Sequence, residues 1–284
     1  MTRQFPIKGR YIIFFWLLPF LYLPGIDSLF GLFPQDVDWY WYELLYMTYA
    51  QLLFGGVMAG LIVYYKIDWR LMFSKPDRSE YPPAIKLTAF VFIFSIATAY
   101  ALFYPLSFTY PEFVELWYID IPPIIYHLQQ SYPIAPNLVS LISLVIFAPV
   151  FEEIAFRGIL LHSWSEKWGV NRAILISSLL FGIVHPDPIG ATAFGIAMSV
   201  LYLRTQTLLI PIICHALNNL VVWLYEVGYT IVEGPVEYTL EEFQSSWLIG
   251  VACAVITFAW AYLYIGGEKH YRSWSLPKIT SRDH

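Results

Sequence analysis

Eight long apolar runs divide this 284-residue sequence and constrain its fold more than any other feature. A helix of about 20 apolar residues crosses the hydrocarbon core of a bilayer. The chain is 58% hydrophobic and only 13% charged, whereas about 25% of a soluble domain is charged. We therefore predict an all-α, polytopic transmembrane helical bundle of about eight helices. The runs lie at residues 9–24, 41–65, 84–104, 137–164, 171–185, 190–204, 207–228 and 246–265.

The distribution of charge between the runs predicts the orientation of the bundle. Of the 16 Lys and Arg residues, 15 fall in the segments that share a side with the two chain ends. The opposite loops, at 25–40, 105–136 and 229–245, contain acidic residues and no Lys or Arg. Because basic residues concentrate in cytoplasmic segments, both termini are predicted to be cytoplasmic. We expect an integral protein of the bacterial cytoplasmic (inner) membrane, with the lipid bilayer as a partner and no nucleic acid.

The chain is predicted to form a single membrane-embedded domain over residues 1–284. The first run lacks a small-residue cleavage pattern, so we expect a retained helix rather than a removed signal peptide. The aromatic and Pro-rich segment 105–136 is predicted to lie in the membrane interface. Residues 268–284 are expected to form a short, basic and frayed cytoplasmic tail. Both cysteines lie in apolar runs, which supports neither a disulfide framework nor a Cys-based zinc site.

The fourth run contains three charged residues, Glu152, Glu153 and Arg157. Each ionisable group at the centre of a bilayer costs roughly 2.5–3.5 kcal/mol on insertion scales, so three in one helix point to a polar cavity. Glu153 and Arg157 are i, i+4 neighbours and are expected to pair. Glu152 is turned by about 100° from Glu153 and stays available. Pro149 is expected to kink or widen the helix. The alternative is a structural ion network that locks helices together.

Two further sites carry histidine. His185 lies at the joint between the short fifth and sixth runs, within His-Pro-Asp-Pro, and Phe181 lies one turn earlier, where it would pack against the imidazole. The alternative is a helix-end histidine capped by nearby carbonyls. In the seventh run, His215 and Asn219 share one helix face, and Asn218 is expected to point elsewhere. The alternative there is an interhelical hydrogen-bonded pair.

Helical rise places these groups at one depth, about 13–20 Å from the cytoplasmic ends of their helices. A carboxylate, two imidazoles and an amide at one level are the groups that activate a water molecule and stabilise an oxyanion. A transporter or channel with a Glu and His proton relay is a rival interpretation, and a non-catalytic binding protein is another.

The three motifs, in this order on successive apolar helices, resemble the signature of the CAAX-processing and bacteriocin-processing (CPBP, or ABI) intramembrane endopeptidases. They read E-E-x-x-x-R at 152–157, F-x-x-x-H at 181–185 and H-x-x-x-N at 215–219. The resemblance covers residues 137–228, the expected catalytic core. It implies hydrolysis of a peptide bond near the membrane, either C-terminal CAAX processing or maturation of a membrane-associated protein. The substrate would be a protein or peptide, lipidated ones included.

The resemblance also implies roles for the residues. Glu152 and His185 would activate the attacking water, and His215 and Asn219 would form the oxyanion hole. The remaining charged pair of the first motif and the phenylalanine of the second would support the site or bind substrate. We expect a glutamic-type enzyme without a cofactor. The alternative is a zinc-dependent version of the same protease, with Glu152, His185 and His215 as ligands.

Overall fold

The computed structural model describes residues 5–17, 39–121, 124–127, 132–234, 238–265, 275–277 and 279, and these residues form helices and connections without a strand. The helices are α1 (Gly9–Leu17), α3 (Trp39–Tyr64), α4 (Trp69–Met72), η2 (Arg78–Glu80), α5 (Tyr81–Thr109), α6 (Pro111–Val114), η3 (Glu115–Ile119), α7 (Ile134–Ile142), η4 (Ser143–Phe147), α8 (Ala148–Glu153), η5 (Ile154–Leu160), α9 (Leu161–Trp168), α10 (Val170–Ile183), α11 (Pro188–Thr205), α12 (Leu209–Glu233), α13 (Leu240–Ser245) and α14 (Trp247–Ile265).

The prediction of an all-α polytopic bundle is confirmed, and each predicted run contains helix. Within the described residues, four helical stretches are long and apolar enough to cross a membrane: Leu44–Tyr64, Arg78–Thr109, Ile134–Trp168 and Leu209–Glu233. Helices α10 and α14 are shorter apolar helices, and α11 covers the sixth run. The second half of the first predicted run, residues 18–24, lies outside the described residues.

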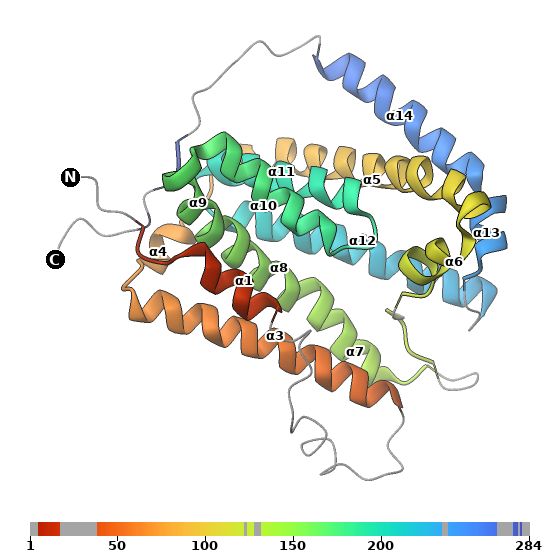
Figure 1. Cartoon of the computed structure of the whole chain (residues 1–284), viewed down its shortest axis with the longest axis horizontal. Coiled ribbons are helices and arrows are strands. Elements are labelled where there is room, and N and C mark those ends of the chain that lie inside the picture. Colours follow the sequence, from red (N-terminus) through yellow and green to blue (C-terminus); the bar gives the residue numbers. More distant parts are fainter. Residues whose placement is uncertain are drawn as a thin grey trace.

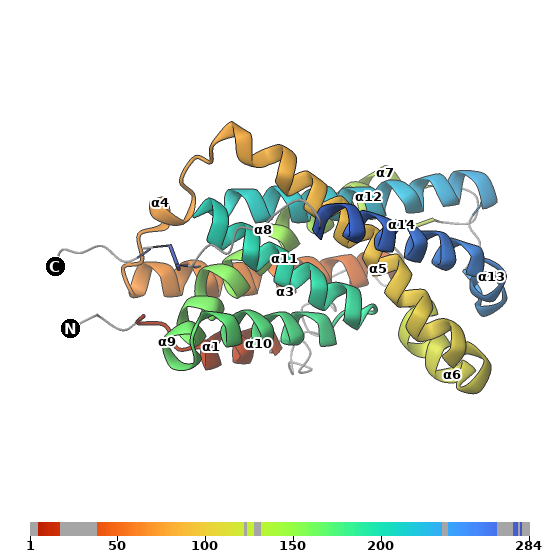
Figure 2. The ribbon, with the colours of Figure 1, turned by 90° about the horizontal axis from the view of Figure 1, so that it is seen from above.

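The helices that carry the three motifs pack around a common centre. Helix α11 packs along both α10 and α5, whereas α12 packs against η4 and α8 (Figures 1 and 2). Helix α14 runs along the far side of α5 and is the outermost element of the bundle in Figure 1. This arrangement brings the helices of the three motifs together, although the first and third motifs begin 63 positions apart, at Glu152 and His215.

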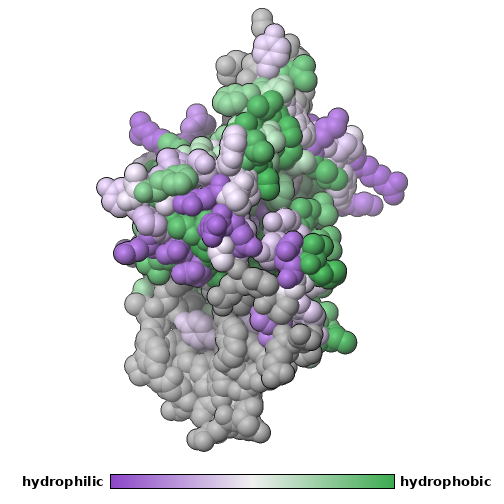
Figure 3. Space-filling model, turned by 90° about the vertical axis from the view of Figure 1, so that its right-hand side faces the viewer, coloured by the Kyte–Doolittle hydropathy of each residue, from purple (hydrophilic) through white to green (hydrophobic). Residues whose placement is uncertain are grey.

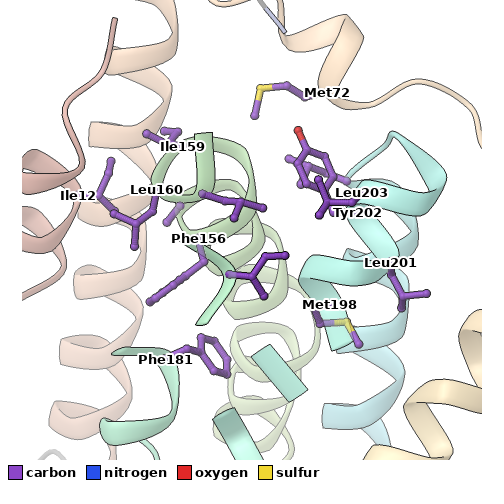
Figure 4. Close-up of a cluster of buried hydrophobic side chains, with 14 of the residues drawn as sticks. Ile12, Met72, Phe156, Ile159, Leu160, Phe181, Met198, Leu201, Tyr202 and Leu203 are labelled. Atoms are coloured by element: carbon purple, nitrogen blue, oxygen red, sulfur yellow. The ribbon is translucent and has the colours of Figure 1, made fainter. Parts of the chain in front are cut away.

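The main hydrophobic core lies between η5, α10 and α11 and extends to α1. Figure 4 shows Phe156 of η5 and Phe181 of α10 lying on the same side of this cluster, with Met198 and Tyr202 contributed by α11. The two phenylalanine rings meet edge to face at a centroid distance of 5.2 Å. The core therefore fixes the first two motif helices against each other next to the charged residues.

The fourth predicted run is one continuous helical stretch, but it is not a regular α-helix. It widens to π-helix at Ser143–Phe147 and again at Ile154–Leu160. In the first wide turn, the Ala148 amide donates to the Ser143 carbonyl. The next amide in this register would serve Leu144, but residue 149 is a proline and has no N–H. The Leu144 carbonyl therefore lacks its helical donor and is free for a side chain.

The segment 105–136 begins as helix rather than as a loop. Helix α5 continues through Pro105 to Thr109, and α6 and η3 follow it. Tyr118 of η3 stacks on Phe103 of α5 at a centroid distance of 4.5 Å and meets Phe243 of α13. Figure 3 shows this end of the molecule, where hydrophilic and apolar side chains lie next to each other on the surface. Such a mixed surface is what the predicted interfacial position requires.

The described part of the C-terminal tail is docked, which differs from the frayed tail that the sequence predicts. Ile279 is 2% exposed and belongs to the main core. Its carbonyl accepts a hydrogen bond from the Asp68 amide at 3.1 Å, and the Ser275 carbonyl accepts one from the Gln206 side chain at 3.0 Å. At the other chain end, the Phe5 amide donates to the Glu166 carboxylate. Phe5 and Ile279, the described residues nearest the two termini, thus lie at the same end of the bundle as Asp68 and Glu166.

Candidate active site

The first motif forms the predicted ion pair in the interior of the bundle. Arg157 Nη1 lies 2.9 Å from Glu153 Oε1, and both side chains are almost fully buried. Arg157 Nη2 donates to the Gly195 carbonyl of α11 at 2.9 Å, and the guanidinium lies 5.1 Å from the centre of the Phe181 ring. The i, i+4 pairing of Glu153 with Arg157 is confirmed. The arginine also ties η5 to α10 and α11.

His215 joins this ion pair from α12. Its Nδ1 lies 2.9 Å from Glu153 Oε1, the same oxygen that accepts from Arg157. A carboxylate oxygen can only accept, so the imidazole carries a proton at Nδ1. Sequence reasoning pairs Glu153 with Arg157 alone, because the contact with His215 joins residues that are 62 positions apart.

Glu152 is the carboxylate that remains available, as predicted. Its Oε2 lies 3.9 Å from His215 Nε2, which is too long for a hydrogen bond. The same oxygen is buried and has no hydrogen-bond partner among the described residues. The side chain as a whole is 25% exposed, so the group is not sealed off. His215 therefore faces both glutamates of the motif, one at each ring nitrogen.

His185 lies at the joint between α10 and α11 and is oriented by Phe181. Its Nδ1 lies 2.6 Å from the Phe181 carbonyl, and the two rings stack with centroids 4.3 Å apart. Because the carbonyl is an acceptor, the Nδ1 atom carries the proton and the neutral ring keeps a lone pair at Nε2. The ring contact with Phe181 is confirmed, and the bond to its carbonyl is the contact that the alternative, a capped helix-end histidine, predicts. His185 has no hydrogen bond or ion pair with Glu152 in the described structure.

Asn219 uses the carbonyl that the proline leaves free. Its Nδ2 donates to the Leu144 carbonyl at 2.9 Å, which links α12 to the first wide turn. Asn218 does not point away from it as expected, because its Nδ2 lies 3.3 Å from Asn219 Oδ1. Both hydrogen bonds fix the plane of the Asn219 amide, and its second N–H remains available.

Several residues near the site are missed by sequence reasoning. Phe194 of α11 meets the His215 ring edge to face at a centroid distance of 5.0 Å. Gly195 contributes only a backbone carbonyl, for which no side-chain signal exists. Asp187 is an N-cap residue flanked by prolines, and that local pattern could have indicated its helix-capping position.

The described residues contain no group of three or more His, Cys, Asp or Glu side chains that could hold a metal ion. The three ligands of the zinc alternative are therefore not brought together in this arrangement. His215 directs its Nδ1 to Glu153, and His185 directs its Nδ1 to a carbonyl. Zinc-binding histidines make the same contacts with one ring nitrogen and bind the metal with the other, so these contacts leave both Nε2 atoms open.

An apolar cavity of about 400 Å³ lies between α7 and α12. Helix α7 forms one wall with Leu138 and Leu141, and α12 forms the other with Trp223 and Val227. Trp223 lies two helical turns beyond His215 on α12. None of the charged motif residues lines this cavity.

Buried acidic, basic and amide groups on three apolar helices define the class of this site, a polar centre within a membrane-embedded helical protein. Comparison with known proteins shows what this part of the chain is similar to. Residues 134–221 match the family described as type II CAAX prenyl endopeptidase, Rce1-like. This match confirms the resemblance to the CPBP endopeptidases and covers all three motifs.

A curated relative is the protein named "Putative membrane peptidase YdiL" of Bacillus subtilis, which is 42% identical over 77 residues. The aligned stretch makes up 26% of this chain and 32% of YdiL, so the chain matches about a third of that relative's length. No solved structure matches this chain.

Proposed function

We propose that this chain is an intramembrane endopeptidase of the glutamic type, acting on a peptide bond of a membrane-associated protein. The observation that carries the proposal is the unpaired Glu152 carboxylate beside the His215 ring, within the segment that matches the endopeptidase family. A buried carboxylate without a donor needs a partner, and a water molecule is the partner that hydrolysis requires.

In the proposed reaction, Glu152 takes a proton from a water molecule whose oxygen attacks the carbonyl carbon of the substrate. The neutral Nε2 of His185 provides a second acceptor that orients this water. The oxyanion that forms is stabilised by the free N–H of Asn219 and by His215 Nε2–H. Donation from that nitrogen requires the doubly protonated ring. When the C–N bond breaks, Glu152 returns its proton to the leaving amine.

Glu153 and Arg157 support this reaction without contacting the substrate. Glu153 accepts hydrogen bonds from both the Arg157 guanidinium and His215 Nδ1, so the orientation of the His215 ring and the proton at its Nδ1 are fixed by a carboxylate. Phe181 fixes His185 in the same way through its carbonyl and its ring. Preorganised groups of this kind lower the barrier because they need no reorientation during the reaction.

A metal-free reaction is part of the proposal, because the side chains of the zinc alternative do not converge. A lipidated peptide and an unmodified peptide would react through the same steps.

The proposal is tested with purified protein in detergent and in liposomes. Wild type and Glu152→Gln are given a prenylated CAAX peptide and an unmodified membrane-anchored peptide, and the products are identified by mass spectrometry. Cleavage by wild type alone supports the proposal. Glu152-dependent proton or solute flux into liposomes, without cleavage of either peptide, would instead establish the transporter.

A further inference from the structure

The joint between α10 and α11 is held by a side-chain contact outside the three motifs. Asp187 Oδ1 accepts from the Gly190 amide at 3.1 Å and caps the start of α11. Its other oxygen, Oδ2, accepts a hydrogen bond from the Ser95 hydroxyl of α5. One carboxylate therefore binds the first turn of α11 and a helix that lies 92 positions earlier in the sequence.

Helix capping alone does not require the contact with Ser95. An N-cap side chain needs one oxygen for the amides of the first turn, and serine serves almost as well as aspartate. The second oxygen of Asp187 reaches across to α5, which packs along α11 (Figure 1). Gly190 makes this approach possible, because a Cβ there would lie 2.6 Å from the Ser95 Cα atom.

Only Pro186 separates Asp187 from His185, and Pro188 follows Asp187. Each proline fixes its own φ and restricts the residue before it, so both His185 and Asp187 have little backbone freedom. The His185 amide also donates to the Gly182 carbonyl at 3.0 Å. A displacement of Asp187 is therefore passed to His185 rather than absorbed by the joint.

We propose that Ser95 and Asp187 are positioning residues whose hydrogen bond holds the α10–α11 joint against α5 and thereby places the His185 imidazole in the active site. Phe181 orients the ring from the α10 side, and the bond between Asp187 and Ser95 fixes the backbone from the α11 side. The inference rests on the proposed function of His185, but it concerns two residues that the motifs do not include.

Single-turnover and steady-state kinetics on Ser95→Ala and Asp187→Ser test this proposal. Asp187→Ser keeps a capping oxygen for Gly190 but is too short to reach α5. Thr98→Ala is the matched control, because the Thr98 hydroxyl of α5 bonds only to carbonyls of its own helix. Hydrogen–deuterium exchange of residues 183–191 is measured in the same samples.

We expect both variants to lower kcat roughly tenfold with KM nearly unchanged, since a small misplacement of a catalytic group slows the chemical step. The double variant should be no worse than either single one, because both remove the same hydrogen bond. Amide exchange at the joint should become faster, and the midpoint of thermal unfolding should match that of Thr98→Ala.

Unchanged kcat in Ser95→Ala, or losses that multiply in the double variant, would overturn the positioning role while leaving the proposed function intact. Absence of Glu152-dependent cleavage in the wild type would instead overturn the proposed function. In that case amide exchange still decides whether the bond holds the joint, since unchanged exchange in Ser95→Ala would refute it.

Discussion

His215 Nδ1 and Arg157 Nη1 both lie 2.9 Å from the same oxygen, Glu153 Oε1. One buried carboxylate thus holds a guanidinium of its own helical stretch and an imidazole from a helix 62 positions later. This shared oxygen connects the first motif to the third. The two adjacent glutamates differ in their contacts, since Glu153 Oε1 binds both groups, whereas Glu152 has only the long 3.9 Å contact with His215 Nε2.

The buried ion pair predicts an asymmetric response to mutation. Arg157→Met removes the guanidinium that neutralises Glu153 and leaves it only the bond from His215, which should destabilise the fold by about 3–5 kcal/mol. Adding Glu153→Gln removes that charge and still offers His215 an acceptor, so the double variant should recover most of the loss. Thermal unfolding in detergent measures both. Equal unfolding midpoints for the single and double variants would contradict the account.

The contribution of Asn219 to stability can be measured separately from its contribution to activity, because its side chain binds the Leu144 carbonyl. Asn219→Ala should leave this carbonyl unpaired, at a cost of about 1–3 kcal/mol, and should lower kcat by about 10²–10³-fold through loss of an oxyanion donor. Pro149→Ala restores a backbone N–H in the register of the wide turn. We expect it to recover stability in the Asn219→Ala background but not activity. Recovery of both would show that Asn219 has only a structural function.

Treatment with a zinc chelator is expected to leave activity unchanged. The reason is that the proposed reaction uses no metal, and the described residues contain no group of three or more His, Cys, Asp or Glu side chains that could hold one. The measurement compares peptide cleavage before and after dialysis against 1,10-phenanthroline, with a zinc protease as the positive control. Loss of activity that added zinc restores would support the zinc alternative.

The docked C-terminal tail should contribute to the free energy of unfolding. Ile279→Ala is expected to cost about 2–5 kcal/mol, because its side chain is buried in the main core. Leu276→Ala, at a half-buried position in the same segment, should cost less. Thermal unfolding provides the comparison. If both variants unfold at the same temperature as the wild type, the tail contributes nothing to the stability of the fold.

Much of the bundle could be predicted because its signals are local. Apolar runs of membrane-spanning length predict the helices, and i, i+4 spacing predicts the pair of Glu153 with Arg157 and the stack of Phe181 on His185. Each of these depends on residues within one or two helical turns.

The remaining features depend on contacts between distant segments. The link from His215 to Glu153 and the bond between Ser95 and Asp187 join residues 62 and 92 positions apart, and no periodicity encodes them. The wide turn of η4 is confirmed as Pro149 predicts, whereas the wide turn of η5 has no such signal, since it alters only the register of backbone hydrogen bonds. The docked tail is not predicted because its contacts, from Ile279 to Asp68 and from Ser275 to Gln206, also join distant segments.

The proposed function depends most on Glu152, and comparative terminal proteomics tests it most directly. Membranes are prepared from cells that carry either wild type or Glu152→Ala at matched expression, with recovery of small membrane proteins confirmed by a positive control. The account predicts new protein termini with the wild type alone, which would also identify the substrate. Identical termini in the two samples would contradict it.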